Sequence, residues 1–414
     1  MKVIVQKFGG TSLATTAQRE RAIDWVEQAI EDGYRTVVVV SAMGRRGDPY
    51  ATDTLLSLVE GTGADAADRD LLMSCGEIVS AVMMAARLAA RGHRARALTG
   101  GQAGIVTDAC FGEARIQAID PEPLERILAD HIIPVVAGFQ GVTEDHQVTT
   151  LGRGGSDTTA VALGAALHAE VVDIFTDVDG VKTADPAMVP DARTLATLDY
   201  DEVFQMANSG ARVIHPRAVE IARHFALPIR IRSPFAPTQG TLVAMGSVGL
   251  DHWAHRDPER SITGITSLPQ LVQFRLSKPA DDEMGWMYRV FQELGAAGVS
   301  VDLINIFPEQ AYFCVMPPQQ AVVEQVLSGL TLEYECSDDR AKVSCVGTAI
   351  HGLPGVMGRF MQALTDAQVN VLQTADSLST ISCLVRQSDV ERAVQALHRQ
   401  FHLAGEVGAD DRRE

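Results

Sequence analysis

The stretch from Leu151 to Val181 constrains the fold most, because loop, helix, strand and polar loop signals follow one another without interruption. A glycine-rich turn over 152–157 (GRGGSD) precedes a small-residue helix, predicted over Thr158–His168, and an apolar strand, predicted over Glu170–Phe175. This order is half of a parallel α/β unit. Glycines let a backbone approach a ligand closely, and free N–H groups at a helix start favour an anion. Arg153 adds a guanidinium suited to a carboxylate or phosphate, although a solvated arginine on an ordinary turn fits this motif alone equally well.

The bulk composition indicates a globular protein of two or three domains, because the chain has 414 residues, 46% of them apolar and 21% charged. The net charge of −18 argues against a nucleic-acid partner, so a few local cations must meet any anionic ligand. The six cysteines show neither CxxC nor zinc spacing, which predicts reduced thiols and no metal site. The N-terminus reads as a strand rather than a signal peptide, and we expect a cytoplasmic protein with no membrane partner.

The first half of the chain alternates strand and helix patterns, as in an α/β sheet covered on both faces. The run RTVVVV at 35–40 lacks polar alternation, which is typical of a strand buried on both sides. Ligands of open α/β sheets lie at the carboxyl ends of the strands, and polar tetrads follow three predicted strands, at 7–10, 41–44 and 176–179. We therefore predict a three-layer αβα domain with a mostly parallel sheet over residues 1–245 and one shared ligand site.

The pattern changes after residue 261, where a strand–helix–strand–strand–helix order occurs twice. This order is the ferredoxin-like split unit. GVSVD at 298–302 and QVNVL at 368–372 fall at matching points, which indicates an internal repeat. Strands are predicted over Leu332–Cys336 and Lys342–Val346, on either side of the boundary between the copies. The expected organisation is a linker at 246–260, two α+β domains at 261–337 and 338–405 that can interlock, and a tail at 406–414.

The segment KFGGTS at 7–12 is a candidate phosphate cradle at a strand-to-helix turn. The N–H groups of Gly9 and Gly10 are expected to face phosphate oxygens, with Lys7 as a point charge. An ordinary turn is the alternative, since the P-loop pattern GxxxxGK[ST] occurs nowhere in the chain. Protein-kinase, metalloprotease and esterase signatures are missing too, so no general base is evident. A carboxylate acceptor needs none, because its pKa of about 4 keeps it ionised at neutral pH.

Six segments in order resemble the aspartokinase family: KFGGTS (7–12), VVVVSAMG (37–44), SCGE (74–77), GRGGSDT (152–158), TDVDGV (176–181) and GARVIHP (210–216). The C-terminal repeat resembles the paired ACT domains of that family, so the resemblance covers essentially the whole chain. The runs at 41–53 and 97–104 look most like the diaminopimelate-responsive aspartokinases of spore-forming bacteria. The resemblance implies phosphoryl transfer from ATP, with Mg²⁺, to the side-chain carboxylate of L-aspartate, the first step toward lysine, threonine, methionine and diaminopimelate. It also implies feedback regulation through the ACT domains.

The resemblance implies a role for each matching position. Lys7 and Asp157 are the expected catalytic residues, with Asp157 orienting Lys7. Arg153 is expected on a carboxylate of L-aspartate and Glu77 near its ammonium, as their charges favour. The other expected substrate positions are Thr52, Gly154, Gly155 and Ser156. The expected nucleotide positions are Lys7, Phe8, Gly9, Gly10, Ser41, Thr176, Asp177, Lys182 and Arg212.

The C-terminal repeat carries no phosphate loop and no clustered acid and base, so we expect an effector site there. A helix start after Gly352, Pro354 and Gly355 offers N–H groups to a carboxylate, and Asp376 next to Ser377 suits an ammonium. Together they fit a free amino acid, which the resemblance names as diaminopimelate or lysine. The alternative is that the repeat only joins subunits, and a homodimer or higher oligomer through these domains is expected in either case.

Three positions depart from the family pattern: Lys182 stands where tyrosine is common, Ala187 where arginine is common and Arg212 where lysine is common. These departures bear on nucleotide affinity rather than on the class of reaction. His215, next to Pro216, is expected to pack or to cap a helix.

Two other functions remain open from the sequence. Another small-acid kinase of the same fold, such as acetylglutamate kinase, is disfavoured by Glu77 and by the double C-terminal repeat. A catalytically inactive amino-acid sensor built on ACT domains is disfavoured by the intact Lys7, Arg153 and Asp157. A fused homoserine dehydrogenase is not expected, because no GxGxxG unit follows.

Overall fold

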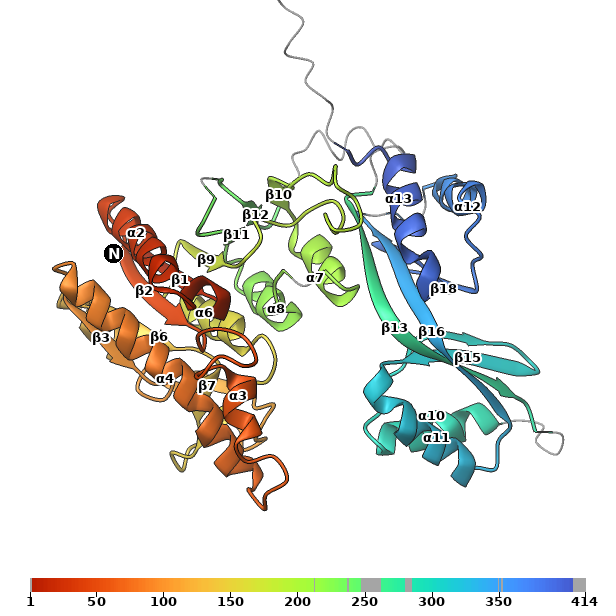
Figure 1. The fold of residues 1–414 in the computed structure, drawn as a ribbon, viewed down its shortest axis with the longest axis horizontal. Coiled ribbons are helices and arrows are strands. Elements are labelled where there is room, and N and C mark those ends of the chain that lie inside the picture. The colour runs from red at the N-terminus through yellow and green to blue at the C-terminus, as the bar shows by residue number, and fades with distance from the viewer. Residues whose placement is uncertain are drawn as a thin grey trace, which may run out of the picture. The chain divides into compact units, whose positions relative to one another are not determined.

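The computed structural model describes residues 2–211, 213–236, 238–246, 262–279, 285–348, 350 and 353–404, which fall into two compact units (Figure 1). Among these residues, the first unit takes 2–181, 194–207 and 213–246, and the second takes 182–193, 208–211 and the described part of 262–404. Two segments of the predicted catalytic domain, 182–193 and 208–211, therefore belong to the second unit. The predicted linker beyond Gly246 and the predicted tail lie outside the described residues.

An eight-stranded sheet forms the centre of the first unit, in the order β10-β12-β11-β9-β1-β2-β6-β3. All neighbouring strands are parallel except β11 and β12, which are antiparallel. The predicted mostly parallel sheet is confirmed. Its strands are β1 (Val3–Phe8), β2 (Arg35–Val40), β3 (Ala95–Leu98), β6 (Ile133–Ala137), β9 (Val171–Phe175), β10 (Thr197–Leu198), β11 (Ile229–Arg232) and β12 (Thr241–Val243).

Helices cover both faces of this sheet, which confirms the predicted three layers. On one face, α2 and α4 share an apolar cluster that includes Phe8 of β1. Side chains alternate along a strand, so Val5 of β1 points to the opposite face, where Gly164 of α6 packs against it. α8 packs beside α6. The helices of this unit are α1 (Gly10–Leu13), α2 (Thr16–Glu31), α3 (Thr52–Ser57), α4 (Ala66–Ala90), α5 (Glu122–Ala129), α6 (Gly155–Ala166), α7 (Tyr200–Asn208, except its last residue) and α8 (Pro216–His224).

α4 is the longest of these helices, and Asp65 caps its start by accepting a hydrogen bond from the N–H of Asp68 at 2.8 Å. Among the described residues, α4 is the one helix long and apolar enough to cross a membrane. Its apolar face, with Ala81, Met84 and Leu88, is buried in the cluster against the sheet. That burial is expected of a core helix.

A second, four-stranded sheet in the first unit, in the order β5-β4-β7-β8, was not predicted from the sequence. Its strands are too short to give a clear alternation of apolar and polar residues. The last of them ends at Thr150, directly before Leu151 and the glycine-rich loop, so this sheet determines where the loop begins. The strands are β4 (Ile105–Thr107), β5 (Ile116–Ile119), β7 (Gln140–Val142) and β8 (Val148–Thr150).

One six-stranded antiparallel sheet runs through the second unit, in the order β14-β15-β13-β16-β18-β17. The long strands β13 (Gly264–Ser277) and β16 (Tyr334–Val346) pair along much of their length and serve both halves. The two strands predicted at Leu332–Cys336 and Lys342–Val346 are therefore one continuous strand, and the predicted boundary between 337 and 338 lies inside it. The other strands are β14 (Asp302–Ile306), β15 (Gln310–Val315), β17 (Gln373–Asp376) and β18 (Thr380–Arg386).

Each half of this sheet carries two helices, in the predicted ferredoxin-like arrangement. α10 (Trp286–Ala296) and α11 (Gln320–Gly329) pack on the first half around Phe274 and Phe313, whose rings stack at 5.5 Å. α12 (Val356–Asp366) and α13 (Val390–Gln400) pack on the second half around Phe360.

The segment 182–193 is held by α13 within the second unit. The Oγ1 atom of Thr183 lies 2.9 Å from Nε2 of His398, which is 1% exposed. The side-chain amide of Gln395 donates to the carbonyl of Met188 at 2.8 Å, and the N–H of Ile265 donates to the carbonyl of Thr183 at 2.7 Å. The polar loop 176–181 of the first unit thus continues in sequence into a segment bound by the second.

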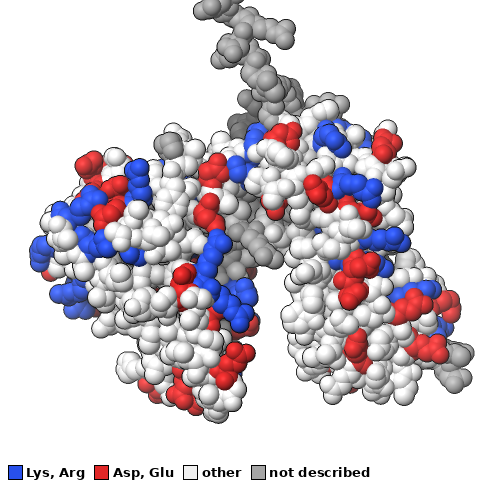
Figure 2. Space-filling view, viewed as in Figure 1, with Lys and Arg blue, Asp and Glu red and all other residues white. Residues whose placement is uncertain are grey.

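Charged side chains of both signs are interspersed over the visible face of each unit (Figure 2). The visible face therefore has no extended surface of positive charge alone, in line with the net charge of −18.

Candidate active site

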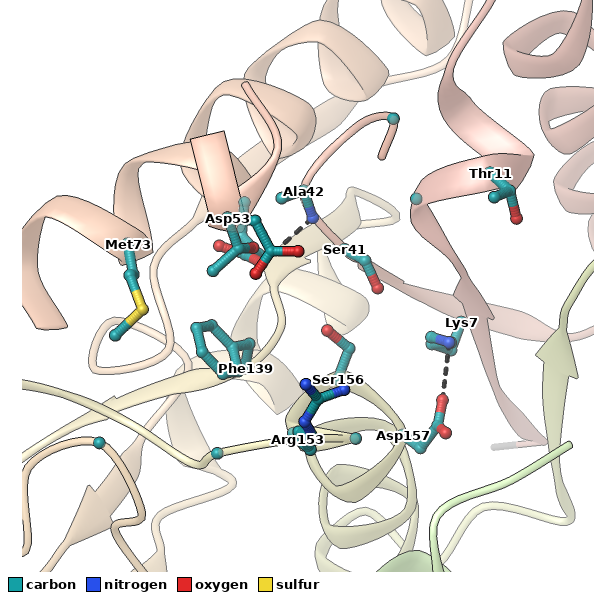
Figure 3. Close-up of a pocket in the computed structure, with 18 residues that line it drawn as sticks. Lys7, Thr11, Ser41, Ala42, Asp53, Met73, Phe139, Arg153, Ser156 and Asp157 are labelled. Atoms are coloured by element: carbon teal, nitrogen blue, oxygen red, sulfur yellow. Dashed lines mark hydrogen bonds and ion pairs between the residues drawn. The ribbon is translucent and has the colours of Figure 1, made fainter. Parts of the chain in front are cut away.

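A cavity of about 500 Å³ opens at the carboxyl ends of β1 and β2, beside the start of α6 (Figure 3). This is the position that the sequence predicted for a shared ligand site. The predicted residues that line the cavity are Lys7, Gly10, Ser41, Thr52, Glu77, Arg153, Gly154, Gly155, Ser156 and Asp157.

Lys7 and Asp157 form an ion pair in the wall of the cavity. Nζ of Lys7 lies 2.7 Å from Oδ1 of Asp157, and the two side chains are only 11% and 12% exposed (Figure 3). The other carboxylate oxygen accepts a hydrogen bond of 3.4 Å from the N–H of His215. Because the pair is shielded from water, its electrostatic attraction is strong and fixes the position of the ammonium group. At the end of β1, that group is placed to bind a phosphate.

Glu77 presents a buried carboxyl group to the cavity from α4. The residue is 3% exposed, and its Oε1 accepts a hydrogen bond from the N–H of Ala42 at 3.2 Å. Its Oε2 has no hydrogen-bond partner among the residues that the structure describes. Burial raises the pKa of Glu77 to about 8, against the opposing effect of hydrogen bonding to the backbone, including the N–H of Ala42. A group of this kind is suited to receive a cation from a ligand.

The glycine-rich loop places Arg153 at the mouth of the cavity and runs into α6 earlier than predicted. α6 begins at Gly155, so Ser156 and Asp157 belong to its first turn rather than to the loop. Gly154 is the N-cap, with a left-handed φ of 66° that favours glycine. The Arg153 side chain is exposed and lines the cavity (Figure 3).

The cradle over residues 8–10 differs from the expectation. The N–H of Gly9, predicted to face a phosphate, instead donates to the carbonyl of Phe175 at 3.2 Å. The Phe8 side chain is fully buried and stacks on Phe175 with ring centroids 4.7 Å apart, so it cannot reach a ligand. Gly10 does line the cavity, and any side chain at this position would overlap the carbonyl of Ala42.

The residues predicted to hold the nucleoside do not line this cavity. Asp177 is exposed and pairs with Arg45 at 3.0 Å, and Thr176 donates a hydrogen bond to it at 3.2 Å. Lys182 is the first residue of the segment that belongs to the second unit. Arg212 lies outside the described residues.

The predicted effector positions lie at the expected ends of elements in the second unit. Gly355 is the N-cap of α12, with a φ of 89°, and both it and Pro354 are exposed. Asp376 ends β17. The hydroxyl of Ser377 is engaged in the turn between β17 and β18, where it lies 2.8 Å from the hydroxyl of Thr380. Gly352 lies outside the described residues.

Several residues that line the cavity were not predicted. Phe139 directly follows Gly138 at the end of β6, so the rule that ligands lie at strand ends was sufficient to find it. Gly112 had no such signal, because its loop is brought to the cavity by the unpredicted four-stranded sheet. The lining residues to which no individual role was assigned are Thr11, Ala42, Gly44, Asp53, Met73, Gly112, Phe139 and Gly152. Of these, Thr11, Ala42, Gly44 and Gly152 lie within segments that were predicted to form the site.

Comparison with known proteins agrees with this fold. Residues 2–233 match the family model of the amino acid kinase family, and residues 343–401 match that of the ACT domain. The chain is 45% identical to aspartokinase 1 of Bacillus subtilis, with 98% of this chain and 100% of that protein aligned. It is 38% identical to the aspartokinase of Geobacillus stearothermophilus, over 99% of each chain.

A solved structure shows the same architecture. E. coli aspartokinase III, in complex with aspartate and ADP, superposes with a TM-score of 0.80 at 25% identity, covering 96% of this chain and 99% of that one. The fold and the strand-end cavity define an amino acid kinase with an appended ACT region. Within that class, the chain belongs to the aspartokinases.

Proposed function

We propose that the chain transfers the γ-phosphoryl group of ATP to the side-chain carboxylate of L-aspartate, giving 4-phospho-L-aspartate and ADP. The observation that carries the proposal is that a buried lysine–aspartate pair, an arginine and a buried glutamate line one cavity. This set offers cations for phosphate and carboxylate groups and one carboxyl group for an ammonium. L-Aspartate carries two carboxylates and one ammonium, so its charges complement the set.

Lys7 would neutralise charge on the transferred phosphoryl group while Asp157 holds its ammonium in place. Mg²⁺ would enter as the complex with ATP, with phosphate oxygens and water as its principal ligands. The described residues contain no cluster of three or more carboxylate, histidine or cysteine side chains that could hold a metal ion. The acceptor carboxylate is ionised at neutral pH, so the reaction rests on positioning and charge neutralisation rather than on a general base.

Trapping the acyl phosphate with hydroxylamine tests the reaction directly. Purified protein with ATP and Mg²⁺ should form the hydroxamate with L-aspartate and not with N-acetyl-L-glutamate. Formation with acetylglutamate instead would make the chain another small-acid kinase. No turnover with either acid would favour the inactive sensor.

Glu77 gives the aspartate site a predictable pH dependence. Below its pKa of about 8 the carboxyl group is mostly protonated and neutral, so it cannot pair with the substrate ammonium. We expect kcat/KM for aspartate to rise by about tenfold per pH unit below the pKa and to level off near it. Glu77→Gln should remove this slope and raise the KM for aspartate. The KM for ATP over the same pH range is the control, and a flat aspartate profile in the wild type would contradict the role.

Arg153→Lys should raise the KM for aspartate by about tenfold or more, because lysine keeps the charge but loses the two-pronged geometry. The KM for ATP should change little. If the ATP KM moves and the aspartate KM does not, Arg153 contacts the nucleotide.

We also propose that the second unit binds an amino acid of the aspartate pathway and regulates the kinase. The supporting observation is the segment 182–193, which follows the predicted nucleotide loop yet is bound by α13. The runs at 41–53 and 97–104, which resemble the diaminopimelate-responsive type, support placing the chain in that type. Separate titrations with lysine, threonine, methionine and diaminopimelate test this, and no change in activity or melting temperature at millimolar concentrations would leave only an assembly role.

A homodimer is the assembly that the second unit favours. β14 is an edge strand of the six-stranded sheet and exposes Ile304 and Ile306, and Phe307 follows it at 50% exposed. An exposed apolar edge strand is a template for pairing with another chain. Light scattering of the full chain tests the stoichiometry.

The six cysteines are all free, and we place the protein in the cytoplasm, where thiols are kept reduced.

A further inference from the structure

Asp70 is a buried carboxylate that the catalytic scheme above does not use. It lies on α4, seven residues before Glu77, and is 1% exposed. Its Oδ2 accepts hydrogen bonds from the N–H of Thr150 at 2.7 Å and from the N–H of Gly112 at 2.9 Å, and its Oδ1 accepts one from the hydroxyl of Thr150 at 2.9 Å. One side chain thus binds two loops that are far apart in sequence.

Both bound loops lead directly to the cavity. Gly112 lines it, and Thr150 is the last residue of β8, three residues before Arg153. Arg217 holds the same two loops by their carbonyl groups, since its Nη1 donates to Leu151 at 3.3 Å and to Ala114 at 3.5 Å. Asp70 binds the amide groups of these loops and Arg217 binds their carbonyl groups.

We propose that Asp70 is a positioning residue that sets the affinity for aspartate by fixing Arg153 and Gly112 relative to Glu77. Glu77 and Asp70 share one rigid helix, so the two groups proposed to bind the ammonium and the carboxylate of the substrate are tied to the same element. This inference rests on the proposed binding of aspartate by Arg153 and Glu77.

Because Asp70 is buried, its hydrogen bonds to Gly112 and Thr150 restrain these segments strongly. A loop that moved away would leave the oxygens of Asp70 without donors and out of reach of water, which costs far more than an exposed hydrogen bond. The alternative loop positions are therefore disfavoured even when the cavity is empty. Arg153 is then already in place, so binding of the substrate carboxylate does not cost the free energy of ordering the loop.

The adjacent threonines of β8 provide a matched test. Thr149 and Thr150 are both fully buried, but the hydroxyl of Thr149 lies 2.6 Å from that of Thr107 and is not among the hydrogen-bond donors to Asp70. Thr150→Val should raise the KM for aspartate by about threefold or more, and Thr149→Val should leave it within about twofold, although both variants lose a buried hydrogen bond. Asp70→Asn loses the charge that strengthens the hydrogen bonds from the two backbone N–H groups and turns an N–H group toward the hydroxyl of Thr150, so it should raise the KM by about tenfold or more.

The split between kinetic constants separates positioning from loss of stability. In Asp70→Asn and Thr150→Val the KM for ATP should stay within about twofold, and calorimetric binding of aspartate should weaken in step with KM. Equal effects of the two threonine variants, or an unchanged aspartate KM in Asp70→Asn, would overturn the proposal. If Asp70→Asn does not fold, the threonine pair decides. Wild-type hydroxamate formation is measured first, because its absence would refute the proposed function rather than the role of Asp70.

Discussion

Lys7→Ala is expected to lower kcat by at least about 100-fold while the KM for ATP changes much less, because the charge of Lys7 is needed most as phosphate charge redistributes in the transition state. Its position favours this role: the ammonium lies at the carboxyl end of β1, in the wall of the cavity, and is fixed by Asp157 at 2.7 Å. Steady-state kinetics with ATP and aspartate each varied measure the two effects. A kcat within tenfold of wild type would remove Lys7 from the catalytic residues.

Loss of the lysine also leaves the carboxylate of Asp157 nearly buried without its cation, which lowers stability regardless of catalysis. The double variant Lys7→Ala with Asp157→Asn removes that unpaired charge, so it should recover melting temperature without recovering kcat. Lys2→Ala is the matched control, because Lys2 precedes the other end of the same strand, where it pairs with Glu170 at 3.6 Å with both side chains largely exposed. A double variant that regained activity with its stability would show that Lys7 acts only through folding.

The arrangement of the first unit was predictable because its signals are local. RTVVVV at 35–40 reads as a strand buried on both faces, and β2 has five consecutive buried residues. The rule that ligands lie beyond strand ends predicted one site for the tetrads 7–10, 41–44 and 176–179. The structure places residues of the first two around one cavity, together with the loop before α6, but no residue of 176–179 lines it.

The features that sequence reasoning missed depend on contacts between distant residues. Whether the N–H of Gly9 is free depends on the carbonyl of Phe175, 166 residues away in sequence, so the motif KFGGTS could not reveal it. The carboxylate of Asp70 looks like an ordinary helix charge until the strand ending at Thr150 is in place. The continuous β16 was divided into two strands because ECSDDRAK, at 335–342, is too polar to read as one.

Gly154→Ala is expected to abolish most of the activity, by at least about 100-fold in kcat/KM, and to lower the melting temperature. Two effects add at this position. A non-glycine residue at a φ of 66° costs about 1–2 kcal/mol. The new methyl group would also overlap the side chain of His215, which caps α8 through its Nδ1 and donates its N–H to Asp157. Displacing His215 therefore disturbs the carboxylate that holds Lys7.

Gly152→Ala separates these two effects, because Gly152 has a similar φ of 73° in the same loop but its nearest neighbour, the carbonyl oxygen of Gly112, is 3.3 Å from the added methyl group. It should lose a comparable amount of stability from the backbone and much less activity. Adding His215→Gly to Gly154→Ala removes both the ring and the Cβ that the methyl group would meet, so this double variant should regain part of the activity lost by Gly154→Ala alone. Equal losses in both glycine variants, with no recovery in the double variant, would mean that backbone strain in the loop, rather than displacement of His215 from Asp157, accounts for the defect.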